Sequence, residues 1–67
     1  MKFTIIDHAT NDILEGYANV QYQADAFYTG QPMRGEKFKE ELNVGESTRY
    51  IFRTGAGTTH ATILRTE

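Results

Sequence analysis

Residues 42–64 read LNVGESTRYIFRTGAGTTHATIL, and this stretch decides the fold. Residues 48–54 are rich in β-branched and aromatic types, which suit a pleated strand. Gly55-Ala56-Gly57 interrupts the run, and glycine allows a tight reversal because it reaches positive φ at little cost. Residues 58–66 then resume the β pattern. The stretch predicts a β-hairpin, which needs further strands because two strands alone are marginally stable in water.

The start of the chain supplies one such partner. Residues 2–7 alternate as a strand does, with Phe3 and Ile5 on one face. Residues 8–12 read HATND, and Asn and Asp in such a segment bond to nearby backbone and tolerate the left-handed conformation. We therefore predict a strand that ends in a tight turn.

A second run of alternation follows from residue 14 to residue 27. Small and apolar residues share one parity, whereas polar and aromatic residues, Tyr17 and Phe27 among them, share the other. The run is too long for one ordinary strand. We predict a second strand over about residues 14–22 and a third over about residues 25–29, with Tyr17 and Phe27 facing outward.

The segment between this run and the hairpin is ambiguous. Residues 29–32 read TGQP and indicate a break in the chain. In residues 33–43, Phe38 and Leu42 have helical spacing, but Gly35 disfavours a helix by about 1 kcal/mol relative to Ala. We predict a long loop with at most a short helical turn.

Together these segments predict one all-β domain over residues 1–67, with five short antiparallel strands and tight turns. A small closed barrel suits this length, and closure removes exposed sheet edges. The alternative is a ββαββ fold, with a helix near residues 33–43 between two hairpins.

Composition bounds the possible functions. The chain of 67 residues has no Cys, and so no disulfide, thiolate metal site or cysteine nucleophile. No apolar run approaches the ~18 residues that would indicate a membrane-spanning helix, and the N-terminus lacks the apolar segment of a secretory signal. We expect a cytoplasmic protein that has no membrane association and needs no cofactor.

Charge is unevenly distributed along the chain. The net charge is −2, but residues 47–66 contain Arg49, Arg53 and Arg65 and no acid. A local basic face can meet phosphate even on an acidic protein. Three solvated arginines on strand faces are the simpler interpretation of the same pattern.

Several motifs share their order and spacing with a known family. A Leu, a Gly three positions later, a β-branched residue, an aromatic residue, a second Gly and an Ala stand at Leu42, Gly45, Thr48, Tyr50, Gly55 and Ala61. Upstream, residues 15–20 read EGYANV, residues 25–29 read DAFYT and residues 35–39 read GEKFK. In these motifs the sequence resembles the cold-shock domain family. The resemblance implies an OB-fold barrel that binds single-stranded RNA or DNA, with the position of Tyr50 facing inward.

The sequence also departs from the family at its base-stacking positions. Asp7-His8 stand near the family's Trp-Phe, Asn19 replaces a Phe, Glu15 a Lys and Thr29 a His. Each base stacked on an aromatic ring contributes about 1–3 kcal/mol. The departures therefore predict weak binding with little sequence preference.

The candidate binding residues are rings that can stack bases and cations that can meet phosphate. They are Tyr17, Phe27, Phe38 and His8, with Arg34, Lys37 and Lys39. The alternative is a protein-interaction module, a small regulator or inhibitor that retains the barrel without nucleic-acid binding.

Catalysis and metal binding have little support in the sequence. Ser47 is the only serine, and no spacing brings it to His8 or His60. The glycines at 55–57 lack the lysine and helix of a phosphate-binding P-loop, so a turn is the better interpretation. A metal site needs three or four ligands, and no cluster has that spacing. We expect no catalytic residues, no metal site and no enzyme.

Overall fold

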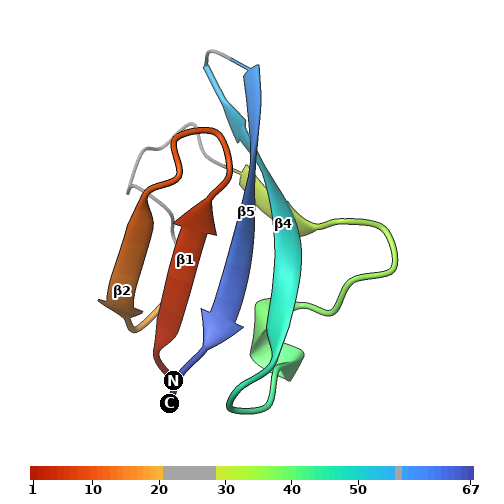
Figure 1. The fold of residues 1–67 in the computed structure, drawn as a ribbon. Coiled ribbons are helices and arrows are strands. Elements are labelled where there is room, and N and C mark those ends of the chain that lie inside the picture. The colour runs from red at the N-terminus through yellow and green to blue at the C-terminus, as the bar shows by residue number, and fades with distance from the viewer. Residues whose placement is uncertain (21–28, 56) are drawn as a thin grey trace.

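The computed structural model describes residues 1–20, 29–55 and 57–67. Five strands form one antiparallel sheet, and the only described helical element is a turn of 3-10 helix at Lys39–Glu41. The strands are β1 (Phe3–Asp7), β2 (Ile13–Tyr17), β3 (Thr29–Pro32), β4 (Ser47–Thr54) and β5 (Gly57–Arg65) (Figure 1). The predicted all-β fold is confirmed, and the described part of residues 33–43 is the predicted loop with one short helical turn.

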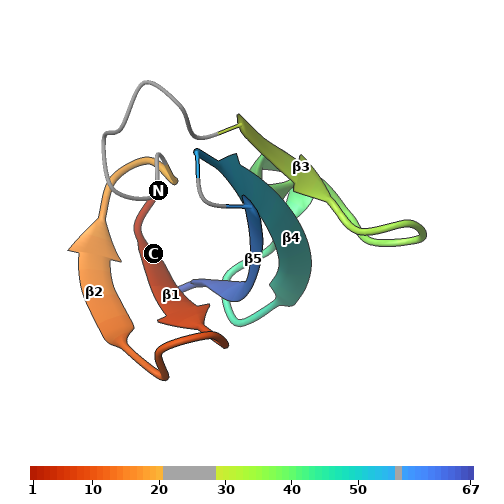
Figure 2. The ribbon, with the colours of Figure 1, turned by 90° about the horizontal axis from the view of Figure 1, so that it is seen from above.

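The sheet order is β2-β1-β5-β4-β3, so the first strand pairs with the last. The sheet curls strongly when it is viewed from above (Figure 2). Strands adjacent in sequence form the pairs β1–β2, β3–β4 and β4–β5. β2 and β3, although consecutive in sequence, lie at the two edges of the sheet. The sequence patterns predicted β1, β2, β4 and β5 in outline, but neither β3 nor the order of the strands in space.

The hairpin predicted from residues 42–64 is the centre of the sheet. Its strands β4 and β5 pair from Ser47↔Leu64 to Thr54↔Gly57, and β5 also pairs with β1 along the whole of β1. The hairpin tip extends past the ends of β1 and β2 (Figure 1). The inward position that the resemblance implies for Tyr50 is confirmed, because Tyr50 and Phe52 are each only 1% exposed whereas Arg49 and Arg53 are exposed.

The core lies on the inner side of the curved sheet. Because side chains alternate along a strand, every second residue of β1, β4 and β5 points inward. The buried apolar residues are Phe3, Ile5, Val20, Leu42, Tyr50, Phe52, Ala61 and Ile63, and Leu14 packs against them. Val20 and Leu42 come from outside the strands, so connecting segments complete the core.

Gly30 of β3 is needed for one core contact. It pairs directly with Phe52, and a Cβ at Gly30 would lie only 2.5 Å from Phe52 Cε1. The Phe52 ring therefore covers the bare backbone of β3. Residues 29–32, which the sequence analysis interpreted as a break, form this edge strand. Pro32 is tolerated there because an edge strand does not need every backbone N–H for pairing.

The second predicted strand is shorter than expected, and its alternation is shifted. β2 ends at Tyr17 rather than near residue 22, and Phe3 pairs with Tyr17 while Ile5 pairs with Leu14. The register shift places an extra residue in β2, and Gly16 has φ 82° within it. Tyr17 is therefore on the same face as the buried Phe3, not on the predicted outward face. The third predicted strand, over about residues 25–29, lies mostly outside the described residues.

Candidate nucleic-acid interface

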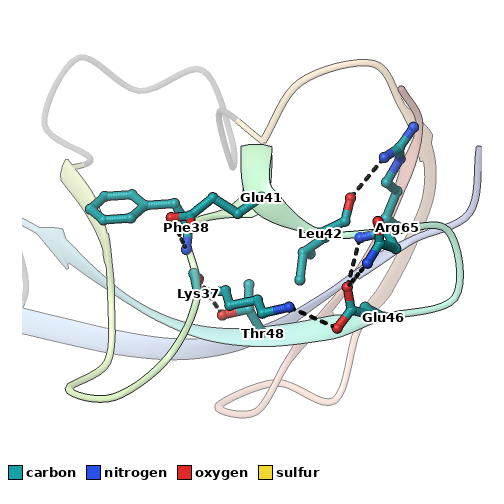
Figure 3. A network of polar contacts seen from close by, with 8 residues as sticks. Lys37, Phe38, Glu41, Leu42, Glu46, Thr48 and Arg65 are labelled. Atoms are coloured by element: carbon teal, nitrogen blue, oxygen red, sulfur yellow. Dashed lines mark hydrogen bonds and ion pairs between the residues drawn. The ribbon is translucent and has the colours of Figure 1, made fainter.

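The predicted residues Arg34, Lys37, Phe38 and Lys39 lie in the loop 33–46, which connects β3 to β4. Phe38 is 55% exposed, and its ring points away from the polar contacts around it (Figure 3). Both lysines are ion-paired: Lys37 Nζ is 3.0 Å from Glu46 Oε2, and Lys39 Nζ is 3.4 Å from Glu40 Oε1. The loop therefore presents an accessible ring, but its lysines are already matched by carboxylates.

Inward-facing residues of β4 hold this loop. The Thr48 hydroxyl donates a hydrogen bond to the Lys37 carbonyl oxygen, and the Lys39 N–H donates to the Tyr50 hydroxyl oxygen at 2.9 Å. Lys39 Nζ also lies 5.6 Å from the centre of the Tyr50 ring, which is within cation–π range. Lys39 is consequently held against β4 by its backbone N–H and by its charge.

The second half of the loop is fixed by Glu46 and Arg65. The backbone and side-chain amides of Asn43 both donate to Glu46 Oε1 at 2.8 Å, and Arg65 donates to the Leu42 carbonyl oxygen at 2.7 Å (Figure 3). The Asn43 and Lys37 hydrogen bonds hold the pKa of Glu46 below its ordinary value. Glu46 therefore stays ionised at neutral pH, and its charge offsets that of Lys37.

The net charge of the loop opposes phosphate binding. Residues 33–46 contain three cations and four carboxylates. Ion pairs at the surface are weak and screened by salt. The carboxylates of the loop nevertheless outnumber its cations, and this excess negative charge disfavours a phosphate backbone. Arg34 is the one cation of this loop for which the described residues provide no ion pair.

The structure separates the other predicted residues from this loop. Tyr17 is 40% exposed and lies on β2, at the opposite end of the sheet order from β3. His8 is exposed in the turn after β1, where its Nε2 lies 2.6 Å from the Thr62 hydroxyl. Phe27 is outside the described residues. The predicted residues do not form a single site in the described part of the chain.

A different surface gathers two arginines on strands that contain no acidic residue. We call it the outer face: the side of β3, β4 and β5 that points away from the core. Cross-strand pairing places Arg49 beside Thr62, Arg53 beside Thr58, and Ile51 between Gln31 and His60. Its residues are Gln31, Arg49, Ile51, Arg53, Thr58, His60 and Thr62. Gly30, Gln31, Ile51 and Arg53 line a shallow hollow on it.

No Asp or Glu occurs in β3, β4 or β5. One carboxylate reaches the outer face from the loop, because Glu36 Oε1 accepts a hydrogen bond from Arg49 Nε at 2.7 Å. This contact holds the pKa of Glu36 below its ordinary value. Arg53 is exposed and makes no ion pair or side-chain hydrogen bond with the described residues.

The sequence contained a signal for this surface, namely the acid-free segment 47–66 with its three arginines. The predicted site contains the loop cations instead, because they flank the aromatic Phe38. Pairing with β3 and β5 was needed to show that Gln31 and His60 border Ile51, since neither is near it in sequence.

The described residues contain no group of three or more side chains suited to hold a metal ion. Among them, no helix has the length and apolar character needed to cross a membrane.

Comparison with protein-family models, with curated proteins and with solved structures finds no match to this chain. The resemblance to cold-shock domains remains a prediction from the motifs.

Proposed function

We propose that this protein is a small non-enzymatic module that binds single-stranded RNA or DNA, weakly and with little sequence preference, through the outer face. The observation that supports the proposal is that Arg49 and Arg53 lie on one face of three strands that carry no acid, and that Arg53 has no ion-pair partner among the described residues. Arginine suits this task, because its planar guanidinium can donate two hydrogen bonds to one phosphate.

The other residues of the outer face suit contacts with bases. Ile51 offers an apolar surface between the two arginines, and Gln31 and His60 beside it carry hydrogen-bonding groups. The shallow hollow at Gln31, Ile51 and Arg53 can partly enclose a flat group such as a base. No large ring lies among these residues, so we expect less stacking energy than the ~1–3 kcal/mol per base of an aromatic platform.

The experiment is a fluorescence-anisotropy titration of labelled oligo-U and oligo-dT at low and moderate salt. Counterion release makes the logarithm of the affinity fall by about 0.7 per phosphate contact for each tenfold rise in salt. We expect Arg53→Ala to weaken binding and to reduce this slope. Lys37→Ala is the matched control, because it removes an exposed cation that is paired with Glu46.

Two results would overturn this placement of the site. Equal loss in Lys37→Ala and Arg53→Ala would mean that only the overall charge matters. Greater loss in Phe38→Ala or Tyr17→Ala would return the site to the predicted rings. The same titration therefore decides between the outer face and the sequence-based set.

A protein-interaction module is the second candidate, and the loop 33–46 favours it. Phe38 is 55% exposed, and charged pairs surround it. An aromatic anchor with a polar rim is typical of protein interfaces. Absence of any oligonucleotide binding at low salt would favour this candidate. A partner recovered by the wild type and lost with Phe38→Ala, while Arg53→Ala keeps it, would establish it.

A further inference from the structure

The two histidines of the chain, 52 positions apart in sequence, lie opposite each other in the sheet. Asp7 of β1 pairs with Ala61 of β5, and the ladder continues one step further, since the His8 N–H donates to the His60 carbonyl oxygen at 3.0 Å. Asp7 and Ala61 are buried, so alternation directs both imidazoles to the opposite, exposed side.

Both imidazoles border one hollow. Its lining residues are His8, Ala9, Thr58, Thr59 and His60. Side chains at directly opposed positions of an antiparallel pair have Cβ atoms about 4.5–5.5 Å apart. Two imidazole rings at that separation can direct a nitrogen atom to one common point.

A further contact orients one of the rings. His8 Nε2 lies 2.6 Å from the Thr62 hydroxyl, so a hydrogen bond occupies that nitrogen and leaves Nδ1 for another ligand. Histidines that bind metals usually hold their second ring nitrogen in such a hydrogen bond, which fixes the orientation of the ring. Thr62 has this role for His8 in the structure.

We propose that His8 and His60 form a two-imidazole chelating site for a divalent transition-metal ion of the Zn²⁺, Ni²⁺ or Cu²⁺ type. Neutral imidazole is a good ligand for these ions. The described residues provide no third strong ligand, so water completes the coordination and the site is exchangeable rather than structural. This inference does not depend on the proposed nucleic-acid binding.

The test is a calorimetric titration of the full chain with ZnCl₂ alone, without nucleic acid, in a buffer that does not chelate zinc. We expect one equivalent to bind. Because chelation makes the second contact intramolecular, His8→Gln and His60→Gln should each weaken binding by about tenfold or more. The double variant should bind more weakly than either single variant, but by less than the sum of the two single losses, since each single loss already includes loss of the chelate.

Both histidines are exposed, so the variants should fold, and circular dichroism checks this. Thr62→Val tests the orienting contact, and it should weaken zinc binding less than either His→Gln change. If the wild type instead binds two equivalents and each single variant binds one with unchanged affinity, the imidazoles bind separately and the proposal is wrong. It is equally wrong if the double variant binds zinc as tightly as the wild type.

Discussion

The loop 33–46 and the outer face of β3, β4 and β5 both carry cations and a large apolar side chain, but they differ in their surroundings. In the loop, Lys37 and Lys39 are paired with Glu46 and Glu40, and the carboxylates outnumber the cations. On the outer face no strand residue is acidic, and Arg53 has no ion-pair partner among the described residues. The two regions therefore differ more in their neighbouring acids than in their cations, and this difference is the reason for which we propose phosphate binding on the outer face.

The two regions meet at β4. Its inward residues Thr48 and Tyr50 hold the loop through hydrogen bonds, while its outward residues Arg49, Ile51 and Arg53 form the centre of the outer face. Changes on the two sides of one strand should therefore separate effects on the loop from effects on binding.

The largest expected effect on stability comes from Gly30→Ala, which tests how the outer face is supported from beneath. The new Cβ would lie 2.5 Å from Phe52 Cε1, and Phe52 is buried in the core. Overpacking of this kind costs about 1–3 kcal/mol, and we expect oligonucleotide binding to fall because β3 must shift. Urea denaturation followed by circular dichroism measures the loss.

Gly55→Ala is the matched control, because nothing lies within 4 Å of a Cβ placed there. We expect it to change the free energy of unfolding by no more than about 0.5 kcal/mol. If the two substitutions have equal effects, Gly30 is not required for close packing against Phe52.

A smaller effect is expected from Thr48→Val, which acts on the loop alone. The change keeps the shape of a buried side chain but removes the hydroxyl that donates to the Lys37 carbonyl oxygen. Loss of one such hydrogen bond costs about 1 kcal/mol. Denaturation should show this loss, whereas the affinity for oligo-U should stay unchanged.

The exposed Ser47→Ala serves as its control and should be neutral for both properties. Reduced oligonucleotide binding by a folded Thr48→Val protein would show that the loop 33–46 contributes to the interface. It would contradict the proposal that the outer face alone binds the oligonucleotide.

The smallest expected effect on stability is a pH dependence that comes from Glu36, which pairs with Arg49, and from Glu46, which pairs with Lys37. Hydrogen bonds from Arg49 to Glu36, and from Asn43 and Lys37 to Glu46, lower the pKa of both carboxyl groups. Since the folded-state pKa is below the unfolded value, their stabilising contribution is complete above the unfolded pKa of about 4.3. It is lost as pH falls through the lower, folded pKa.

Carboxyl ¹³C chemical shifts measured against pH check this prediction. We expect Arg49→Ala to return the pKa of Glu36 towards its ordinary value and to leave Glu46 unaffected. Lys37→Ala should restore only part of the shift at Glu46, because the Asn43 N–H remains a donor. Complete restoration by Lys37→Ala would mean that the Asn43 hydrogen bonds do not lower the pKa of Glu46.

The sequence predicted the structure correctly where neighbouring residues in the chain determine it. Alternation and turn residues predicted the hairpin 48–66, the strand at residues 2–7 and the turn after it, where Asn11 has the expected positive φ of 61°. It was less informative at β2 and β3. A single register shift at Gly16 reversed the face of Tyr17, and pairing with β4 made a strand of residues that look like a turn.

The sequence by itself determined the all-β class and the central hairpin, because these follow from a period of two and from glycine punctuation, and the family resemblance implied the inward face of Tyr50. The tertiary structure alone decided the sheet order, the placing of Gln31 and His60 beside Ile51 on the outer face, and the meeting of His8 with His60. Such features depend on which distant strands pair, and pairing is set by the register and packing of the whole sheet rather than by the pattern within any one segment.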